Sequence, residues 1–277
     1  LAVCCALALG ACSQKDSAQP AGSASGVMAS AKIEGPSVTV KTTRGEAAVP
    51  RNPERVAVYD LGMLDTLNKL GVPTGMSVDK NLLPYLDAYF KQTKPAGTLF
   101  EPDYEALNAY KPQLVIIGSR TAKAFDQLSR IAPTIEMTAD TAHLKDSAKE
   151  RIDALAQIFG KQAEADKLKV EINASFEAAK AADSSIKEKG NHGQPVTFEY
   201  IKKTNPDWLF VLDRSAAIGE EGKAAKDVLD NPLVAETTAW KKGQVVYLPP
   251  ETYLAAGGTQ ELLNASKQVT EAFNAAK

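Results

Sequence analysis

One segment of this chain occurs twice in similar form, and the repetition limits what the chain can fold into. The segment YEALNAYKPQLVIIGSR (104–120) aligns without a gap with FEYIKKTNPDWLFVLDR (198–214). Each copy has an aromatic residue followed by glutamate, a proline that ends a helix, an apolar strand and a final arginine. The repeat predicts two similar α/β lobes.

Short apolar runs alternate with helical periods ahead of the first copy. We expect strands at 55–59 (RVAVY) and 73–77, and helices at 61–70, closed by Gly71, and around 84–91. This βαβα order predicts a parallel sheet covered by helices.

The segment between the copies has helical composition. Residues 144–189 contain few turn formers and are interrupted by Gly160, so they predict two long helices. A helical connector is stiff, so a large closure of the lobes is not expected. The expected plan is an N-terminal α/β lobe at 38–143, a helical linker at 144–189 and a C-terminal α/β lobe at 190–277.

The first residues look like an export signal. LAVCCALALGAC (1–12) is apolar but too short to cross a bilayer, as in the core of a secretory signal peptide. Leu9 to Cys12 resembles a bacterial lipobox, which predicts a lipid on Cys12; the alternative is an ordinary signal with a chance cysteine. All three cysteines lie here, so no disulfide is expected. Residues 13–37 are small and polar and predict a flexible tether.

Charge and motifs exclude several classes of function. The 32 basic and 34 acidic residues nearly cancel, and no basic stripe is present, so nucleic acid is not an expected partner. No GxSxG, HExxH or Walker A motif occurs, and an enzyme is not expected. The two histidines, His143 and His192, are too few for a histidine metal cage, and His143 reads as a polar surface residue.

The repeated charged residues suggest a binding site. Arg120 and Arg214 each follow a strand, and ligands of parallel sheets bind beyond the carboxyl ends of strands. The pair predicts a clamp for an anionic ligand, although each arginine could instead form an ion pair with a neighbour at the lobe surface, such as Asp213. Glu105 and Glu199 lie in first turns of helices, where the helix dipole alone would stabilise them. Alternatively, they form two equivalent contacts for a two-fold membrane partner.

Several motifs together resemble one family. The lipobox, RVAVYDLGMLDTLNKLGVP, EPDYEALNAYKPQLVIIGSR, the helical linker, NHGQPVTFEYI and NPDWLFVLDRSAAIGEEG resemble the periplasmic siderophore-binding lipoproteins of ABC iron importers. The similarity is to the branch that binds ferric catecholates of the enterobactin type, over most of 38–277. It implies a class III periplasmic binding protein, with two Rossmann-like lobes joined by long helices. It also implies a monomer in the periplasm, anchored to the membrane by the lipid on Cys12.

The resemblance also implies roles for single residues. Arg120 and Arg214 would contact the catecholate oxygens. His192 and Tyr253 would bind Fe(III) directly when the siderophore supplies four donors, and phenolate oxygen suits this hard cation. For Tyr253 the alternative is packing at the cleft edge, with Tyr247 the more obvious core residue. Glu105 and Glu199 would dock on arginines of the ABC permease. Fe(III) is then cargo within the siderophore complex, and no intrinsic cofactor is expected.

The chain departs from this family before the second copy. Only 190–197 separate the linker from it, so a βαβ unit of roughly 30 residues is missing and no third basic cleft residue can be assigned. We therefore expect a shortened second lobe with an unpaired sheet edge. The leading function is ferric catecholate capture for ABC iron transport. The alternatives are a receptor for haem or another anionic metal chelate, and a binding-impaired remnant lipoprotein.

Overall fold

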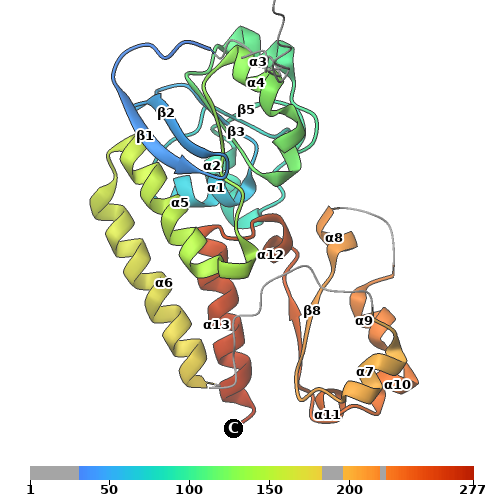
Figure 1. Ribbon diagram of the computed structural model, residues 1–277. Helices are drawn as coiled ribbons and strands as arrows, with labels where there is room; N and C mark the ends of the chain where they lie inside the picture. The colour runs from blue at the N-terminus through green and yellow to red at the C-terminus, as the bar shows by residue number, and fades with distance from the viewer. Residues whose placement is uncertain (1–30, 183–195, 219–222) are drawn as a thin grey trace, which may run out of the picture.

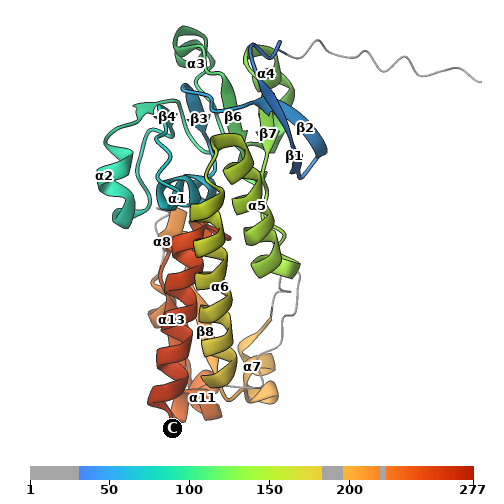
Figure 2. The same ribbon diagram turned by 90° about the vertical axis from the view of Figure 1, so that its left-hand side faces the viewer.

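The computed structural model describes residues 31–182, 196–218 and 223–277. Figures 1 and 2 show two lobes, one at each end of the molecule, with long helices running between them. The predicted α/β class with two lobes and a helical connection is confirmed.

The N-terminal lobe is built on a parallel sheet of five strands in the order β5-β4-β3-β6-β7. Its strands are short and apolar, and every residue of β3 and β6 is buried, as expected for strands covered on both faces. The expected strand and helix order is confirmed, although the strand expected at 73–77 is reduced to its last two residues. The strands are β3 (Val56–Val58), β4 (Met76–Ser77), β5 (Lys94–Pro95), β6 (Leu114–Ile117) and β7 (Thr134–Glu136). The helices are α1 (Leu61–Lys69), α2 (Asp87–Phe90), α3 (Tyr104–Tyr110) and α4 (Phe125–Ile131), with 3-10 turns η1 (Pro84–Leu86), η2 (Ser119–Ala124) and η3 (Thr141–His143).

An antiparallel hairpin precedes this sheet and was not expected from the sequence. Its strands are β1 (Ser37–Thr42) and β2 (Gly45–Pro50). Val40 and Val49 are buried in the core of the lobe, so the hairpin is part of the fold.

Two long helices follow the first lobe, as predicted. They are α5 (Leu144–Phe159) and α6 (Gln162–Ala182), separated at Gly160, whose φ of 66° is the left-handed conformation that glycine adopts at a helix end. Helix α6 packs against both α5 and the C-terminal helix α13 (Thr259–Ala275), and α6 and α13 lie side by side in both views. The last residues of the predicted linker, 183–189, lie outside the described residues.

In the described part of the C-terminal lobe the sheet has two strands, β8 (Leu209–Leu212) and β9 (Val245–Leu248), which pair in parallel. Phe210 is 43% exposed, although its ring contacts the rings of Trp208, which precedes β8, and of Phe273, which lies in α13. Tyr247 is 37% exposed, so the expectation that it is a core residue is wrong: a sheet of two strands has too few neighbours to cover it. The remaining helices are α7 (Phe198–Thr204), α8 (Arg214–Ile218), α9 (Ala225–Leu229), α10 (Pro232–Ala235), α11 (Thr238–Lys241) and α12 (Glu251–Leu254).

The two copies of the repeat have the same local structure. Asp103 and Thr197 each cap a seven-residue helix, α3 or α7, by accepting a hydrogen bond from the backbone N–H three residues later. Both helices end at a non-glycine residue in the left-handed conformation, Lys111 (φ 53°) and Asn205 (φ 45°). A strand and then an arginine follow in each lobe, so the predicted repeat is confirmed.

Candidate functional site

A cleft of about 420 Å³ lies between the two lobes. From the N-terminal lobe it is lined by residues that follow sheet strands: Asp60 after β3, Arg120 after β6 and Thr138 after β7. From the other side it is lined by Leu212, the last residue of β8, and by α12. Figure 1 shows α8 and α12 at this junction.

Tyr253 of α12 lies between the two repeated arginines. Arg120 donates from its two terminal nitrogens to the backbone oxygens of Tyr253 (2.9 Å) and Leu254 (3.2 Å), and its guanidinium carbon lies 5.0 Å from the centre of the Tyr253 ring. Arg214 donates from Nε to the Tyr253 hydroxyl at 3.1 Å. The structure therefore brings three of the predicted site residues together, from the segments that follow β6, β8 and β9.

This arrangement favours an anionic tyrosine. The hydrogen bond from Arg214 lowers the pKa of Tyr253, and the positive charges of Arg120 and Arg214 lower it further, while partial burial opposes them. A phenolate oxygen is a hard donor suited to Fe(III), and the guanidinium groups suit the oxygens of an anionic chelate.

Local structure holds both arginines in place. Gly118 follows the last residue of β6, and a Cβ at this position would collide with the carboxylate of Asp60, so a larger residue here would displace Asp60. The next residue, Thr121, is buried and donates to the backbone oxygen of Leu99 at 2.7 Å. Before Arg214, the carboxylate of Asp213 accepts hydrogen bonds from the N–H of Ala216 in α8 (3.0 Å) and from the N–H of Ala225, the first residue of α9 (2.8 Å), and so anchors the start of α8.

A buried arginine supports the floor of the cleft. Arg151 of α5 is 4% exposed, and its Nη2 lies 3.3 Å from Oδ1 of Asp60, which also caps α1. Burial lowers the pKa of Arg151, and the nearby charges of Asp60 and Asp65 oppose this effect. Gly257 leaves room for the guanidinium, because a Cβ there would collide with Arg151. The sequence analysis did not predict a role for Arg151. The signal that could have indicated one was a charged residue on the apolar face of a helix.

Two buried carboxylates attach α13 to the first lobe. The N-cap residue of α13 is Gly258, which has no side chain, and Asp65 of α1 takes over the capping role by accepting from the N–H groups of Gln260 and Glu261 at 3.0 Å. Glu261 in turn accepts from the hydroxyl of Thr252 on α12 at 2.5 Å. Burial raises the pKa of Asp65 to about 6 and that of Glu261 to about 7. The segment that carries Tyr253 is therefore fixed to the N-terminal lobe.

The other predicted residues lie elsewhere. Glu105 and Glu199 are exposed in the first turns of α3 and α7, at opposite ends of the molecule (Figure 1). His192 and Cys12 fall outside the described residues. His143 is exposed, as expected, with Nδ1 3.0 Å from a carboxylate oxygen of Asp140.

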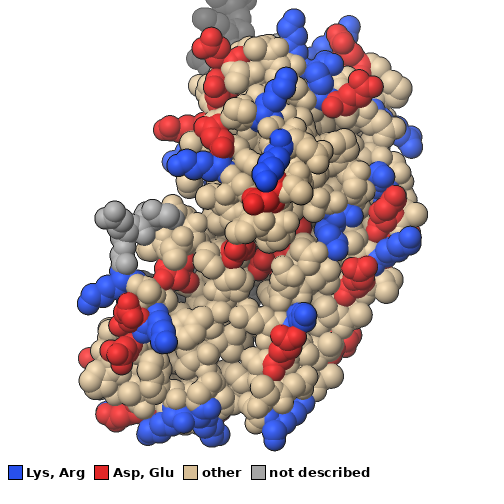
Figure 3. All heavy atoms as spheres, turned by 180° about the vertical axis from the view of Figure 1, so that it is seen from behind, with Lys and Arg blue, Asp and Glu red and all other residues tan. Residues whose placement is uncertain are grey.

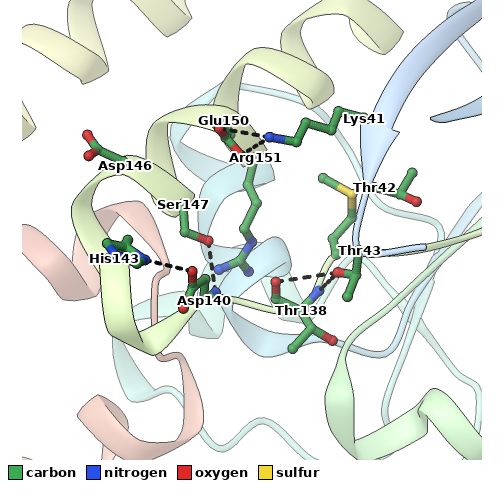
Figure 4. A pocket seen from close by; sticks show the side chains of 11 residues that line it. Lys41, Thr42, Thr43, Thr138, Asp140, His143, Asp146, Ser147, Glu150 and Arg151 are labelled. Atoms are coloured by element: carbon green, nitrogen blue, oxygen red, sulfur yellow. Dashed lines mark hydrogen bonds and ion pairs between the residues drawn. The ribbon is translucent and has the colours of Figure 1, made fainter. Parts of the chain in front are cut away.

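A second cavity, of about 490 Å³, lies between the hairpin and α5 (Figure 4). Two pairs of its charged side chains contact each other: Lys41 contacts Glu150 at 2.9 Å, and His143 contacts Asp140. Across the described ranges no group of three or more His, Cys, Asp or Glu residues is arranged to hold a metal. No helix within these ranges is long and apolar enough to cross a membrane. Seen from behind, basic and acidic side chains are interspersed over both lobes (Figure 3).

Comparison with known proteins shows which family this chain belongs to. The sequence profile described as "Periplasmic binding protein" matches residues 56–190 and 182–252. The petrobactin-binding protein YclQ of Bacillus subtilis is 34% identical in an alignment that covers 84% of this chain and 87% of that protein. Its crystal structure superposes with a TM-score of 0.79 at 32% identity, over 86% of this chain and 99% of that one.

Two further relatives come from Vibrio. The ferric-anguibactin-binding protein FatB of Vibrio anguillarum is 28% identical, over 78% of this chain and 81% of its own. The catecholate-siderophore binding protein VctP of Vibrio cholerae has a TM-score of 0.74 at 26% identity, over 87% of this chain and all of its own.

Proposed function

Because the chain belongs to the periplasmic binding protein family, we propose that it captures a ferric siderophore between its lobes and delivers it to the permease of an ABC iron importer. The family consists of substrate-binding proteins, not enzymes. The similar proteins from Bacillus and Vibrio named above bind petrobactin, ferric anguibactin and a catecholate siderophore.

The observation that carries this proposal is Tyr253 held between Arg120 and Arg214. A ferric catecholate is anionic and presents several oxygens, so two guanidinium groups from opposite lobes match its charge and shape. Tyr253 adds a phenolate oxygen for direct binding of Fe(III) when the chelate leaves coordination positions open. We assign His192 as the second protein ligand in that case, on the sequence resemblance alone.

Delivery to the permease is assigned to the repeated glutamates. Glu105 and Glu199 are exposed, lie in equivalent positions of the two lobes and follow the capping residues of α3 and α7. Hydrogen bonding to its own N–H and to Thr197 lowers the pKa of Glu199, so this carboxylate is charged at neutral pH. Two carboxylates in equivalent positions suit a permease with two equivalent basic contacts.

The cellular location is inferred from the periplasmic binding protein family and from the first residues of the chain. Periplasmic binding proteins of importers work outside the cytoplasmic membrane. A lipid on Cys12 would keep this monomeric receptor near its permease; the predicted tether would end before residue 37, because Ser37 belongs to β1 and the N–H of Ala31 already bonds the oxygen of Ser129.

A titration with ferric chelates tests the proposal. Trp208 and Trp240 both lie in the C-terminal lobe and report ligand binding through quenching of their fluorescence. We expect saturable quenching by a ferric dicatecholate at micromolar concentration or below, and much weaker binding in Arg120→Ala. Saturation by haem alone, seen as a shift of the Soret band of free haem, would support the haem receptor. No binding of any chelate, and no ligand-induced rise in melting temperature, would support the remnant lipoprotein.

A further inference from the structure

A third cavity opens on the same edge of the N-terminal sheet as the arginine site. It measures about 250 Å³ and is lined by Val78, Leu82, Leu99 and Phe100 of the first lobe and by Ile218 of α8. The loops that form it follow β4 and β5, whereas the arginine site lies beyond β3 and β6. The two cavities thus occupy neighbouring strand ends, where ligands of parallel sheets bind.

Phe100 is presented at this cavity by a rigid turn. Among the exposed large apolar side chains in the described ranges it is the most exposed aromatic one, at 63%. Its turn is closed by a hydrogen bond from Thr98 N to Glu101 O (2.9 Å), and the Thr98 hydroxyl accepts from the N–H groups of Phe100 and Glu101. At Gly97 (φ 95°) a Cβ would collide with the backbone at Glu101, so glycine is required here.

The turn is also attached to its neighbours. Two hydrogen bonds join Asp79 and Gly97. The N–H of Asp79 donates to the Gly97 oxygen at 2.7 Å, and the N–H of Gly97 donates to the Asp79 carboxylate at 2.8 Å. Thr121, the residue after Arg120, donates to the oxygen of Leu99. The Phe100 turn and the arginine therefore share one rigid support, and an exposed apolar ring on such a support suggests a ligand contact.

Helix α8 sets the spacing between the two cavities. Arg214, its first residue, bonds Tyr253, and Ile218, its last residue, lines the Phe100 cavity. At 1.5 Å of rise per residue these two residues are about 6 Å apart along the helix axis. One siderophore can span this distance and contact both cavities.

We propose that the cavity around Phe100 is a subsite for an aryl ring of the ferric siderophore, while Arg120, Tyr253 and Arg214 hold the anionic part. The walls are apolar, Phe100 offers a face for ring stacking, and Lys80 at the same cavity supplies a positive charge for ring oxygens. This inference rests on the proposed function and narrows the substrate class. The subsite selects aryl-containing chelates over ferric chelates made only of carboxylates and hydroxyls.

The test compares two anionic ferric chelates. Wild type, Phe100→Ala and Phe100→Leu are titrated with a ferric complex of linear di(2,3-dihydroxybenzoyl-serine), which has aryl rings, and with ferric citrate, which has none. We expect Phe100→Ala to weaken dicatecholate binding about tenfold and to change citrate binding less than twofold, with Phe100→Leu between. Tyr200→Ala, which removes an exposed aromatic ring of α7, is the matched control and should bind both chelates like wild type.

The outcomes separate this inference from the proposed function. Unchanged dicatecholate binding in Phe100→Ala, or equal weakening of both chelates, overturns the subsite while the receptor function stands. If wild type binds neither chelate, the receptor function fails, and the subsite is decided with iron-free 2,3-dihydroxybenzoate by saturation-transfer NMR. Transfer in wild type that is lost in Phe100→Ala supports the subsite; equal or absent transfer overturns it.

Discussion

In the N-terminal lobe the repeated strand β6 lies between β3 and β7, and all four of its residues are buried. In the C-terminal lobe the matching strand β8 pairs with β9, and none of its residues is buried. The helix before each strand nevertheless has a side-chain cap, seven residues and a left-handed end in both lobes. Local structure thus forms without extensive burial, whereas burial depends on how many neighbouring strands and helices the lobe supplies.

The largest effect should come from matched strand residues. Ile116 and Phe210 occupy equivalent positions of the repeat, but Ile116 is fully buried and Phe210 is 43% exposed. We expect Ile116→Ala to lower the free energy of unfolding by about 3–4 kcal/mol, and Phe210→Ala by about 1 kcal/mol despite the larger side chain removed. Urea unfolding followed by far-UV circular dichroism measures both. Equal losses would show that β8 is covered in solution.

The two repeated arginines should differ in what they support. Arg120 holds the backbone of Tyr253 and Leu254 as well as facing the ligand, whereas Arg214 bonds the Tyr253 hydroxyl. Arg120→Ala should therefore weaken ferric dicatecholate binding about 100-fold and also lower the melting temperature. Arg214→Ala should weaken binding about tenfold with the melting temperature unchanged. A larger binding loss in Arg214→Ala would reverse this ranking.

The attachment of α13 to the first lobe should depend on pH. Burial raises the pKa of Glu261 from about 4.5 in the unfolded chain to about 7 in the fold, so the folded state holds this proton more tightly. The resulting stability is fully present below pH 4.5 and is lost as the pH rises through 7. Since a difference of one in pKa corresponds to about 1.4 kcal/mol, the loss between these two pKa values is on the order of 3–4 kcal/mol.

Glu261→Gln tests this dependence. Glutamine can still accept the hydrogen bond from Thr252 and does not ionise. Melting temperatures between pH 5 and pH 8 should fall less steeply in this variant than in wild type. Glu271→Gln, on an exposed part of the same helix, is the control and should follow wild type. If the melting temperatures of Glu261→Gln and wild type fell equally with pH, Glu261 would not be the source of the pH dependence.

The smallest effects should come from the helix caps. Asp103→Ala and Thr197→Ala each remove the side chain that accepts from the third N–H of a seven-residue helix. Each should cost about 1 kcal/mol, with similar values in the two lobes because the cap is a local interaction. Urea unfolding with tryptophan fluorescence reports the C-terminal lobe, and circular dichroism reports both. A cost confined to one lobe would mean that burial decides even these local contacts.

Much of the fold could be predicted because it depends on residues close in sequence. The repeat, the break at Gly160 and the alternation of strands and helices all appear as spacings of apolar and turn-forming residues. The site was predicted in part, since Arg120 and Arg214 follow strands. Asp65, Arg151 and Glu261 were missed because their role depends on contacts between α1, α5 and α13, which are far apart in the chain.

The sequence by itself determined the two α/β units, their connecting helices and the arginine at the end of each repeated strand, because these features arise from local propensity and periodicity. Only the tertiary structure decided that Tyr253 lies between those arginines and that Phe100 is held beside them on the same sheet edge. It also decided that Tyr247 is exposed. The physical reason is that burial, charge pairing and cavity shape depend on which distant segments pack together.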